Sequence, residues 1–170
     1  MKPVFLIVAF IVFSLQISAQ SKIGYVDSDA IMGQLPDAQD ARTQLDELIR
    51  EWQSELTRLQ SEWKTKYDDY ERRKLMLSDQ ARAEIEAQLI QMEKEIVSYR
   101  EKKFGTNGEL FQKQDELMKP VQNKVFNLIQ KIAKDENYDF ILDRSGGVLV
   151  LYAKEEHDIT AKVLQELINK

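Results

Sequence analysis

The stretch REWQSELTRLQSEWKTKYDDY, residues 50–70, decides the fold of this chain. Its large apolar side chains recur every three or four residues, and the residues between them are polar or charged. This spacing places the apolar side chains on one narrow face of an α-helix. The same stripe begins further toward the N-terminus, and its members are Leu45, Leu48, Trp52, Leu56, Leu59, Trp63, Tyr67 and Tyr70.

The helix that carries this stripe is expected to begin near Pro36, because proline suits the first turn of a helix. No glycine or further proline occurs before about Leu75. At a rise of 1.5 Å per residue, the helix is a rod on the order of 60 Å long. A domain of this size cannot wrap such a rod, so another helix is expected to cover the stripe.

A second helix is expected after Ser78, whose side chain can cap it, with Asp79 in its first turn. It carries a second apolar stripe that runs from Ala81 to Ile132. Two stripes on either side of a short turn predict an antiparallel helical hairpin with Leu75–Asp79 at its tip. The alternative is a parallel homo-oligomeric coiled coil that uses each helix separately.

The second helix contains interruptions at Gly105, Gly108 and Pro120, and these three residues are candidate hinges. Each glycine costs up to about 1 kcal/mol relative to alanine within a helix. Alanine at both glycine positions is therefore expected to raise helix propensity and heat stability. A local bend or a close approach between helices explains the glycines equally well. Pro120 is expected to kink the helix or to mark a boundary.

The two ends of the chain have strand-like composition. Residues Ile23–Val26 predict a short strand, and the runs Tyr138–Asp143 and Gly147–Ala153 predict a β-hairpin joined by a turn at residues 144–147. The last run is apolar on both faces, which is typical of a strand buried on both sides. One copy offers too few strands to provide that cover, so helices and other copies of the chain are expected to supply it. An amphipathic helix after His157 can face the sheet.

Residues 1–19 have the composition of a cleaved secretory signal peptide. Lys2 precedes the apolar run Val4–Phe13, and Ala19 supplies a small residue before a cleavage site at Gln20. The alternative is a transmembrane anchor, but the run is shorter than the roughly 20 residues that a span requires. The N-terminus therefore predicts a secreted protein.

Charge and composition argue against several functions. After loss of residues 1–19, the chain has 23 basic and 29 acidic residues, a poor match to general nucleic-acid binding. Cysteine is absent, and His157, next to Asp158, is the only histidine. No phosphate-binding loop or nucleophile motif is present, and the acidic residues near Asp135 lack the ligand spacing of an EF-hand. We expect no enzymatic activity, cofactor or metal.

Three stretches together resemble the OmpH/Skp family of periplasmic chaperones. They are KIGYVDSDAIMGQLP at residues 22–36, LMKPVQNKVFNLIQKIAKDENYDFILD at residues 117–143, and GGVLVLYAKEEHDITAKVLQELIN at residues 146–169. The most specific features are Pro120, Tyr138-Asp139-Phe140, Gly146-Gly147 and Asp158-Ile159-Thr160.

The resemblance implies a mostly α, α+β fold in which helical arms project from a small β-body completed by homotrimerisation. It assigns residues 20–35 and 120–170 to the body and residues 36–119 to the arm. It also implies a periplasmic holdase that binds unfolded outer-membrane proteins between its arms without ATP. The expected trimer residues in the body are Tyr25, Phe140, Leu142, Val148, Leu149, Val150 and Leu151.

The arm is net acidic, with 14 basic and 19 acidic residues between positions 37 and 118. The resemblance implies peripheral contact of basic arms with membrane or lipopolysaccharide, and in this sequence only the tip is locally basic. The alternative function is a structural or tethering coiled-coil protein of the cell envelope that docks a partner at the tip. The tip residues are Arg72, Arg73, Lys74, Leu75, Met76, Leu77 and Arg82.

Overall fold

The computed structural model of the chain describes residues 21–147 and 149–169, so the expected signal peptide and Val148 lie outside the described residues. Helices dominate the described part, and two short strands form a small sheet. The elements in order are β1 (Ile23–Val26), α2 (Ser28–Gln34), α3 (Pro36–Arg73), a 3-10 turn (Lys74–Met76), α4 (Asp79–Phe104), α5 (Glu109–Asp135), β2 (Phe140–Asp143), a second 3-10 turn (Glu155–His157) and α6 (Thr160–Ile168).

The described residues divide into two compact units. One unit contains residues 21–31 and 128–169, and the other contains residues 32–127. The first unit holds the sheet, the C-terminal end of α5 and α6, and the second holds α3, α4 and the rest of α5. The boundaries drawn from the sequence between body and arm remain predictions.

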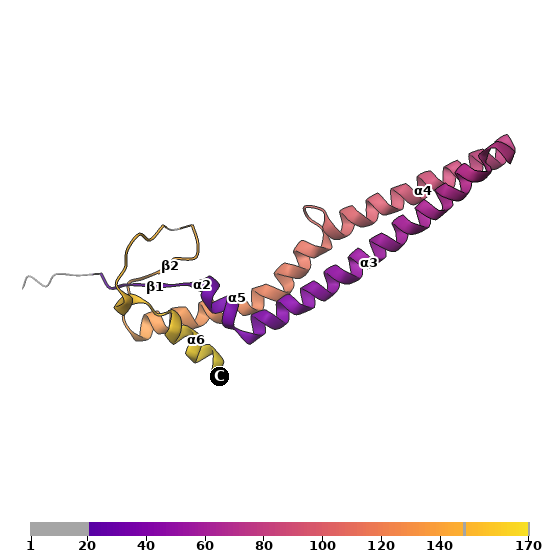
Figure 1. Cartoon of the computed structure of the whole chain (residues 1–170). Coiled ribbons are helices and arrows are strands. Elements are labelled where there is room, and N and C mark those ends of the chain that lie inside the picture. Colours follow the sequence, from indigo (N-terminus) through magenta and orange to yellow (C-terminus); the bar gives the residue numbers. More distant parts are fainter. Residues whose placement is uncertain (1–20, 148, 170) are drawn as a thin grey trace, which may run out of the picture. The chain divides into compact units, whose positions relative to one another are not determined.

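The expected helical hairpin is confirmed in the second unit, where α3 and α4 run side by side (Figure 1). Helix α3 has Pro36 in its first turn, as the sequence predicts. The turn is closed by Ser78, whose hydroxyl oxygen accepts a hydrogen bond from the backbone N–H of Ala81. Trp52, Tyr70 and Leu89 are buried between the helices of this unit, whereas Trp63 is half-buried.

The second helix is interrupted where the sequence predicts, between Phe104 and Glu109, and a short loop protrudes there (Figure 1). A Cβ atom on Gly105 would lie 2.4 Å from the carbonyl oxygen of Glu101. One on Gly108 would lie 2.9 Å from the backbone nitrogen of Gly105. Alanine at either position would therefore strain the loop, so the expected gain in heat stability is wrong for this backbone. Whether the loop acts as a hinge remains a prediction.

Pro120 does not end a helix, because α5 continues through it from Glu109 to Asp135. A helix end at this proline, one of the two expected outcomes, is therefore wrong, whereas the division between body and arm drawn there remains a prediction. Proline leaves the carbonyl group four residues earlier, on Glu116, without its helical partner. Both residues are exposed, so water can hydrate that carbonyl group without breaking the helix.

The sheet differs from the predicted β-hairpin. Strands β1 and β2 are parallel, with Ile23 opposite Phe140 and Val26 opposite Asp143. Parallel strands require a long connection, and the whole helical hairpin supplies it. Residues 149–153 are not in a strand, and Leu149 and Leu151 are 83% and 87% exposed. Within the described residues, Leu149, Leu151 and Tyr152 remain exposed, whereas Val150 and Ala153 are half-buried.

The first unit has a small core around β1 and α6. The last helix begins at Thr160 as predicted, and it buries Val163 and Leu167. A further backbone link joins the start of this helix to the sheet, since the N–H of Ile159 donates to the carbonyl oxygen of Tyr25 at 3.0 Å. The buried apolar residues of this unit are Tyr25, Val26, Ile31, Leu128, Ile132, Ile159, Val163 and Leu167.

Candidate functional site

The sheet unit exposes apolar side chains on both strands and on the segment that follows them. Ile23 on β1 is 46% exposed, and Phe140 on β2 is 61% exposed. Leu149, Leu151 and Tyr152 are more exposed still. Exposed apolar groups that lie together on a soluble protein usually mark an interaction surface. We call this set the body surface.

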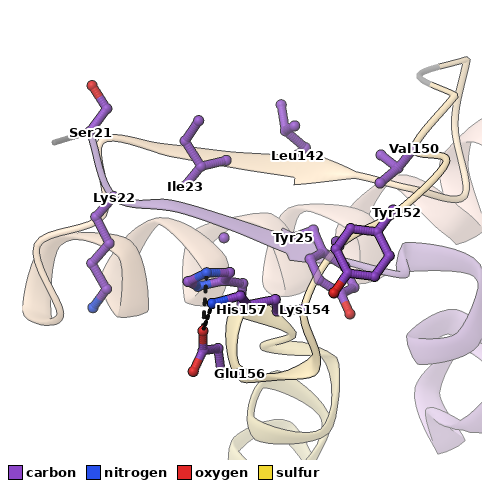
Figure 2. Close-up of a pocket in the computed structure, with 12 residues that line it drawn as sticks. Ser21, Lys22, Ile23, Tyr25, Leu142, Val150, Tyr152, Lys154, Glu156 and His157 are labelled. Carbon is purple, nitrogen blue, oxygen red and sulfur yellow. Dashed lines mark ion pairs between the residues drawn. The ribbon is translucent and has the colours of Figure 1, made fainter.

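An open pocket of about 630 Å³ lies beside this surface. Figure 2 shows residues that line it, with Tyr25 on β1, Leu142 on β2, and Val150 and Tyr152 on the following segment. His157 also lines the pocket, and its Nε2 atom is 3.7 Å from a carboxylate oxygen of Glu156. Within the described residues, no group of His, Asp and Glu side chains has the arrangement of a metal site.

Charged groups hold the edge of the sheet unit in place. Arg144 follows β2, and its Nε donates to the Asp27 carboxylate at 3.2 Å while Nη1 lies 3.9 Å from the Asp158 carboxylate. The hydrogen bond from Arg144 to Asp27 raises the pKa of the guanidinium group, which stays charged. Burial, together with the nearby Asp158 carboxylate, raises the pKa of the Tyr25 hydroxyl. These groups stabilise a local structure and form no catalytic arrangement.

The trimer residues predicted from the sequence fall into different environments. Tyr25 is buried within its own chain, with 6% of its surface exposed. Phe140, Leu142, Leu149 and Leu151 are exposed, Val150 is half-buried, and Val148 lies outside the described residues. The structure of one chain therefore leaves four of these residues accessible to another molecule.

The tip of the helical hairpin is less cationic than the sequence suggests. Arg72 lies 3.7 Å from Asp69, and Arg73 pairs with the same carboxylate. Lys74 lies 3.4 Å from Glu71, and Arg82 pairs with Asp79. Such exposed ion pairs contribute about 0–1 kcal/mol each, but they neutralise the positive charge locally.

The apolar side chains of the tip are freely accessible. Leu75 is 96% exposed and Met76 is 79% exposed, whereas Leu77 is half-buried. The tip is therefore an apolar end surrounded by paired charges.

Sequence reasoning missed a row of exposed apolar side chains on the returning helices. Ile90 and Val97 on α4 are 52% and 55% exposed, and Phe111 on α5 is 56% exposed. Ile90 and Val97 are seven residues apart, so they lie on one face of α4, and each directly follows a member of the second stripe. This seven-residue spacing is the sequence feature from which an apolar face of α4 beside the second stripe could have been predicted. We call Ile90, Val97 and Phe111 the flank row.

The flank row has no counterpart of similar extent on α3 within the described residues. On that helix, the outer faces are almost wholly polar, and Tyr67 is its only large apolar side chain more than a third exposed. No helix in the described part of the chain is long and apolar enough to span a membrane. Helix α3 therefore presents a nearly polar outer surface, whereas α4 and α5 present scattered apolar side chains.

Comparison with known proteins assigns the family. Residues 22–167 match the model of the family described as outer membrane protein (OmpH-like). The chain is 28% identical to the chaperone protein Skp of Vibrio cholerae over 151 residues, which cover 88% of this chain and 85% of the relative. It is also 28% identical to the chaperone protein Skp of Photorhabdus luminescens over 161 residues, covering 91% and 90% of the two chains.

A solved structure shares the fold. The crystal structure of an OmpH-like protein from Caulobacter crescentus CB15 superimposes with a TM-score of 0.74 at 17% sequence identity, covering 88% of this chain and 85% of that chain. The sequence match over nearly the whole described chain and the shared fold agree with each other. The chain belongs to the OmpH-like family and is a periplasmic chaperone, not an enzyme.

Proposed function

We propose that this protein is an ATP-independent holdase that keeps unfolded outer-membrane proteins soluble between the helical arms of a homotrimer. The observation that carries the proposal is the flank row of exposed apolar side chains on α4 and α5, which lie beside the almost wholly polar outer faces of α3. A surface of this kind can contact many apolar segments weakly while remaining soluble itself. The names of the related chaperones and of the family support the same function.

The body surface supports assembly of several copies. A two-stranded sheet is at best marginally stable in water without further cover. The exposed Phe140, Leu149 and Leu151 side chains would lose contact with water if another copy packed against them. The outer edge of β2 could also pair with an extended segment of that copy. The number of three copies comes from the family resemblance.

The energy available from the flank row determines how clients would be held. Burying one large apolar side chain contributes about 1.5–3 kcal/mol. This is less than the roughly 4 kcal/mol of a millimolar complex. Retention of a client therefore requires several contacts at once, on more than one arm, and these together can give high avidity. Each contact can break separately, so release requires no nucleotide.

The test replaces the flank row with serine, as Ile90→Ser, Val97→Ser and Phe111→Ser in one variant. An unfolded outer-membrane barrel is diluted from urea, and its aggregation is followed by light scattering without nucleotide. The variant should require several times more protein than the wild type for equal protection. A matched control carries Gln53→Ser, Gln60→Ser and Lys64→Ser on exposed positions of α3. Equal protection by both variants would contradict a client surface at the flank row.

The tip favours a second candidate function. Leu75 and Met76 form an accessible apolar end that could dock a specific envelope partner, as a tethering protein would require. In that case Leu75→Ser should abolish binding of one stoichiometric partner. Neither the wild type nor the variant should then prevent aggregation of the barrel. Contact of the tips with membrane or lipopolysaccharide remains a prediction that vesicle binding would test.

A further inference from the structure

The break between α4 and α5 lies beside a cluster of side chains that joins both of its ends to α3. Lys103, near the end of α4, pairs with Glu109, the first residue of α5. Lys102 lies 3.6 Å from the same carboxylate. The pair therefore connects two helices that have no continuous helical backbone between them.

The Lys103 ammonium also faces aromatic rings. It lies 4.6 Å from the ring centroid of Trp52 on α3 and 5.9 Å from that of Tyr99 on α4. Its side chain is only 16% exposed, in contrast to the 70% of neighbouring Lys102. Trp52 is buried, and Phe104 meets it edge-on with ring centroids 6.1 Å apart. Lys103 and Phe104 at the end of α4 thus both contact Trp52 on α3, and Lys103 links this tryptophan to Glu109 on the other side of the break.

We propose that Trp52, Lys103 and Glu109 form a clamp that holds the interrupted returning helix against α3 and so restricts bending at the loop. A cation between an aromatic face and a carboxylate is attracted by both, and partial burial strengthens each attraction. The charges also suit the helix ends, with Lys102 and Lys103 at the C-terminus of α4 and Glu109 at the N-terminus of α5.

The clamp changes what the glycines at the break imply. The loop backbone requires glycine at positions 105 and 108, because it leaves no room for a Cβ atom at either position. The compact backbone of the loop therefore explains both glycines, and flexibility of the helix at the break is not required to explain them. Mobility of the returning helix depends instead on whether Lys103 remains between Trp52 and Glu109. This inference concerns the arm itself and does not depend on client binding.

The test measures amide hydrogen exchange in the full-length protein. Glu109→Gln removes the charge and retains the shape, and Lys103→Met removes the cation and retains the apolar stem. Each should speed exchange across residues 105–112 by roughly three- to tenfold, with little change across residues 85–92 near the buried Leu89. The matched control is Glu116→Gln, which breaks the Lys113–Glu116 pair within α5 at 2.6 Å. Exchange in Glu109→Gln that equals the control would overturn the clamp.

A charge swap separates the clamp from a simple ion pair. Lys103→Glu combined with Glu109→Lys restores opposite charges but places a carboxylate over the face of Trp52. We expect fast exchange to persist in this double variant. Trp52 emission, isolated in a Trp63→Phe background, should shift to longer wavelength in Glu109→Gln as the ring gains water. If the charge swap restores slow amide exchange, or if the emission spectrum of Trp52 does not shift in Glu109→Gln, Trp52 is not part of the clamp.

Discussion

The ring of Tyr138 packs against the backbone of Gly24 so closely that a Cβ atom there would lie 2.8 Å from its Cε1 atom. The Lys22 ammonium lies 3.9 Å from the centroid of the same ring. Tyr138 precedes β2 and Gly24 lies within β1, so this contact joins the two strand segments, which are more than a hundred residues apart in the sequence. It explains why a glycine occupies the interior of a strand, where this residue normally weakens the sheet.

Gly24→Ala should therefore destabilise the sheet unit by about 1–3 kcal/mol, because the ring or the strand must move. Thermal unfolding followed by circular dichroism measures the effect. Gly33→Ala is the control, since a Cβ there meets nothing within 4 Å and the change adds helix propensity in α2. A Gly24→Ala variant as stable as the control would contradict the packing described here.

The two tryptophans of the first stripe should contribute differently to the free energy of unfolding. Trp52 is 6% exposed and contacts Phe104, whereas Trp63 is half-buried and stacks on Tyr67 with ring centroids 5.1 Å apart. Trp52→Ala should cost about 3–5 kcal/mol, as do other truncations of buried aromatic residues, and Trp63→Ala clearly less. Urea unfolding of both variants gives the comparison. Equal losses would mean that the stripe is covered evenly along its length.

Most of the helical hairpin could be predicted because its signals are local. Pro36 marks a helix start, Ser78 caps α4, and glycines mark the break after Phe104. The stripe also predicts which face of α3 is covered. It does not fix which residues meet across the hairpin, so the contact between Trp52 and Lys103 could not be found from spacing alone.

The sheet was predicted only in part because strand pairing is a long-range property. Nothing near Ile23–Val26 indicates that its partner is Phe140–Asp143, more than a hundred residues away. The apolar run at residues 149–153 has strand composition, but composition cannot provide a partner within one chain. The exposure of the flank row could not be predicted for a related reason, since the exposure of Ile90 and Val97 beside the second stripe depends on which face of α4 the other helix covers.

Asp143 gives a prediction for acid conditions. Burial acts to raise the pKa of its carboxyl group, but hydrogen bonds from the hydroxyl and N–H groups of Ser28 and Ser145 outweigh burial and lower it. A lowered pKa in the folded state means that this carboxylate stabilises the fold above its unfolded pKa of about 3.9. That contribution is lost as the pH falls through the lower folded value.

Thermal unfolding from pH 7 to about pH 3 tests this linkage. Asp143→Asn should lower the melting temperature at pH 7 and show a shallower loss of stability in acid than the wild type. Asp115→Asn, at an exposed position of α5, serves as the control and should follow the wild-type curve. If the melting temperature of Asp143→Asn falls with pH as steeply as that of the wild type, this carboxylate does not contribute to the loss of stability in acid.

The body surface should govern assembly. Leu149 is 83% exposed in the single chain, so Leu149→Asp should leave the fold of the unit intact. It should dissociate the proposed trimer, because a carboxylate would lose hydration at the interface without a partner. Sedimentation velocity at micromolar concentration measures the mass. Leu75→Asp, at a position of the tip that is 96% exposed, should leave the proposed trimer intact. If Leu149→Asp sediments with the mass of a trimer, as Leu75→Asp should, Leu149 does not lie at the interface.

Prevention of aggregation is the most direct test of the proposed chaperone activity. An unfolded outer-membrane barrel is diluted from urea into buffer that holds rising concentrations of the wild-type protein, with and without ATP, and light scattering is recorded. We predict that scattering falls to near zero when trimer and barrel are about equimolar, with ATP making no difference. Scattering that stays unchanged at every ratio, or that falls only when ATP is present, would contradict an ATP-independent holdase.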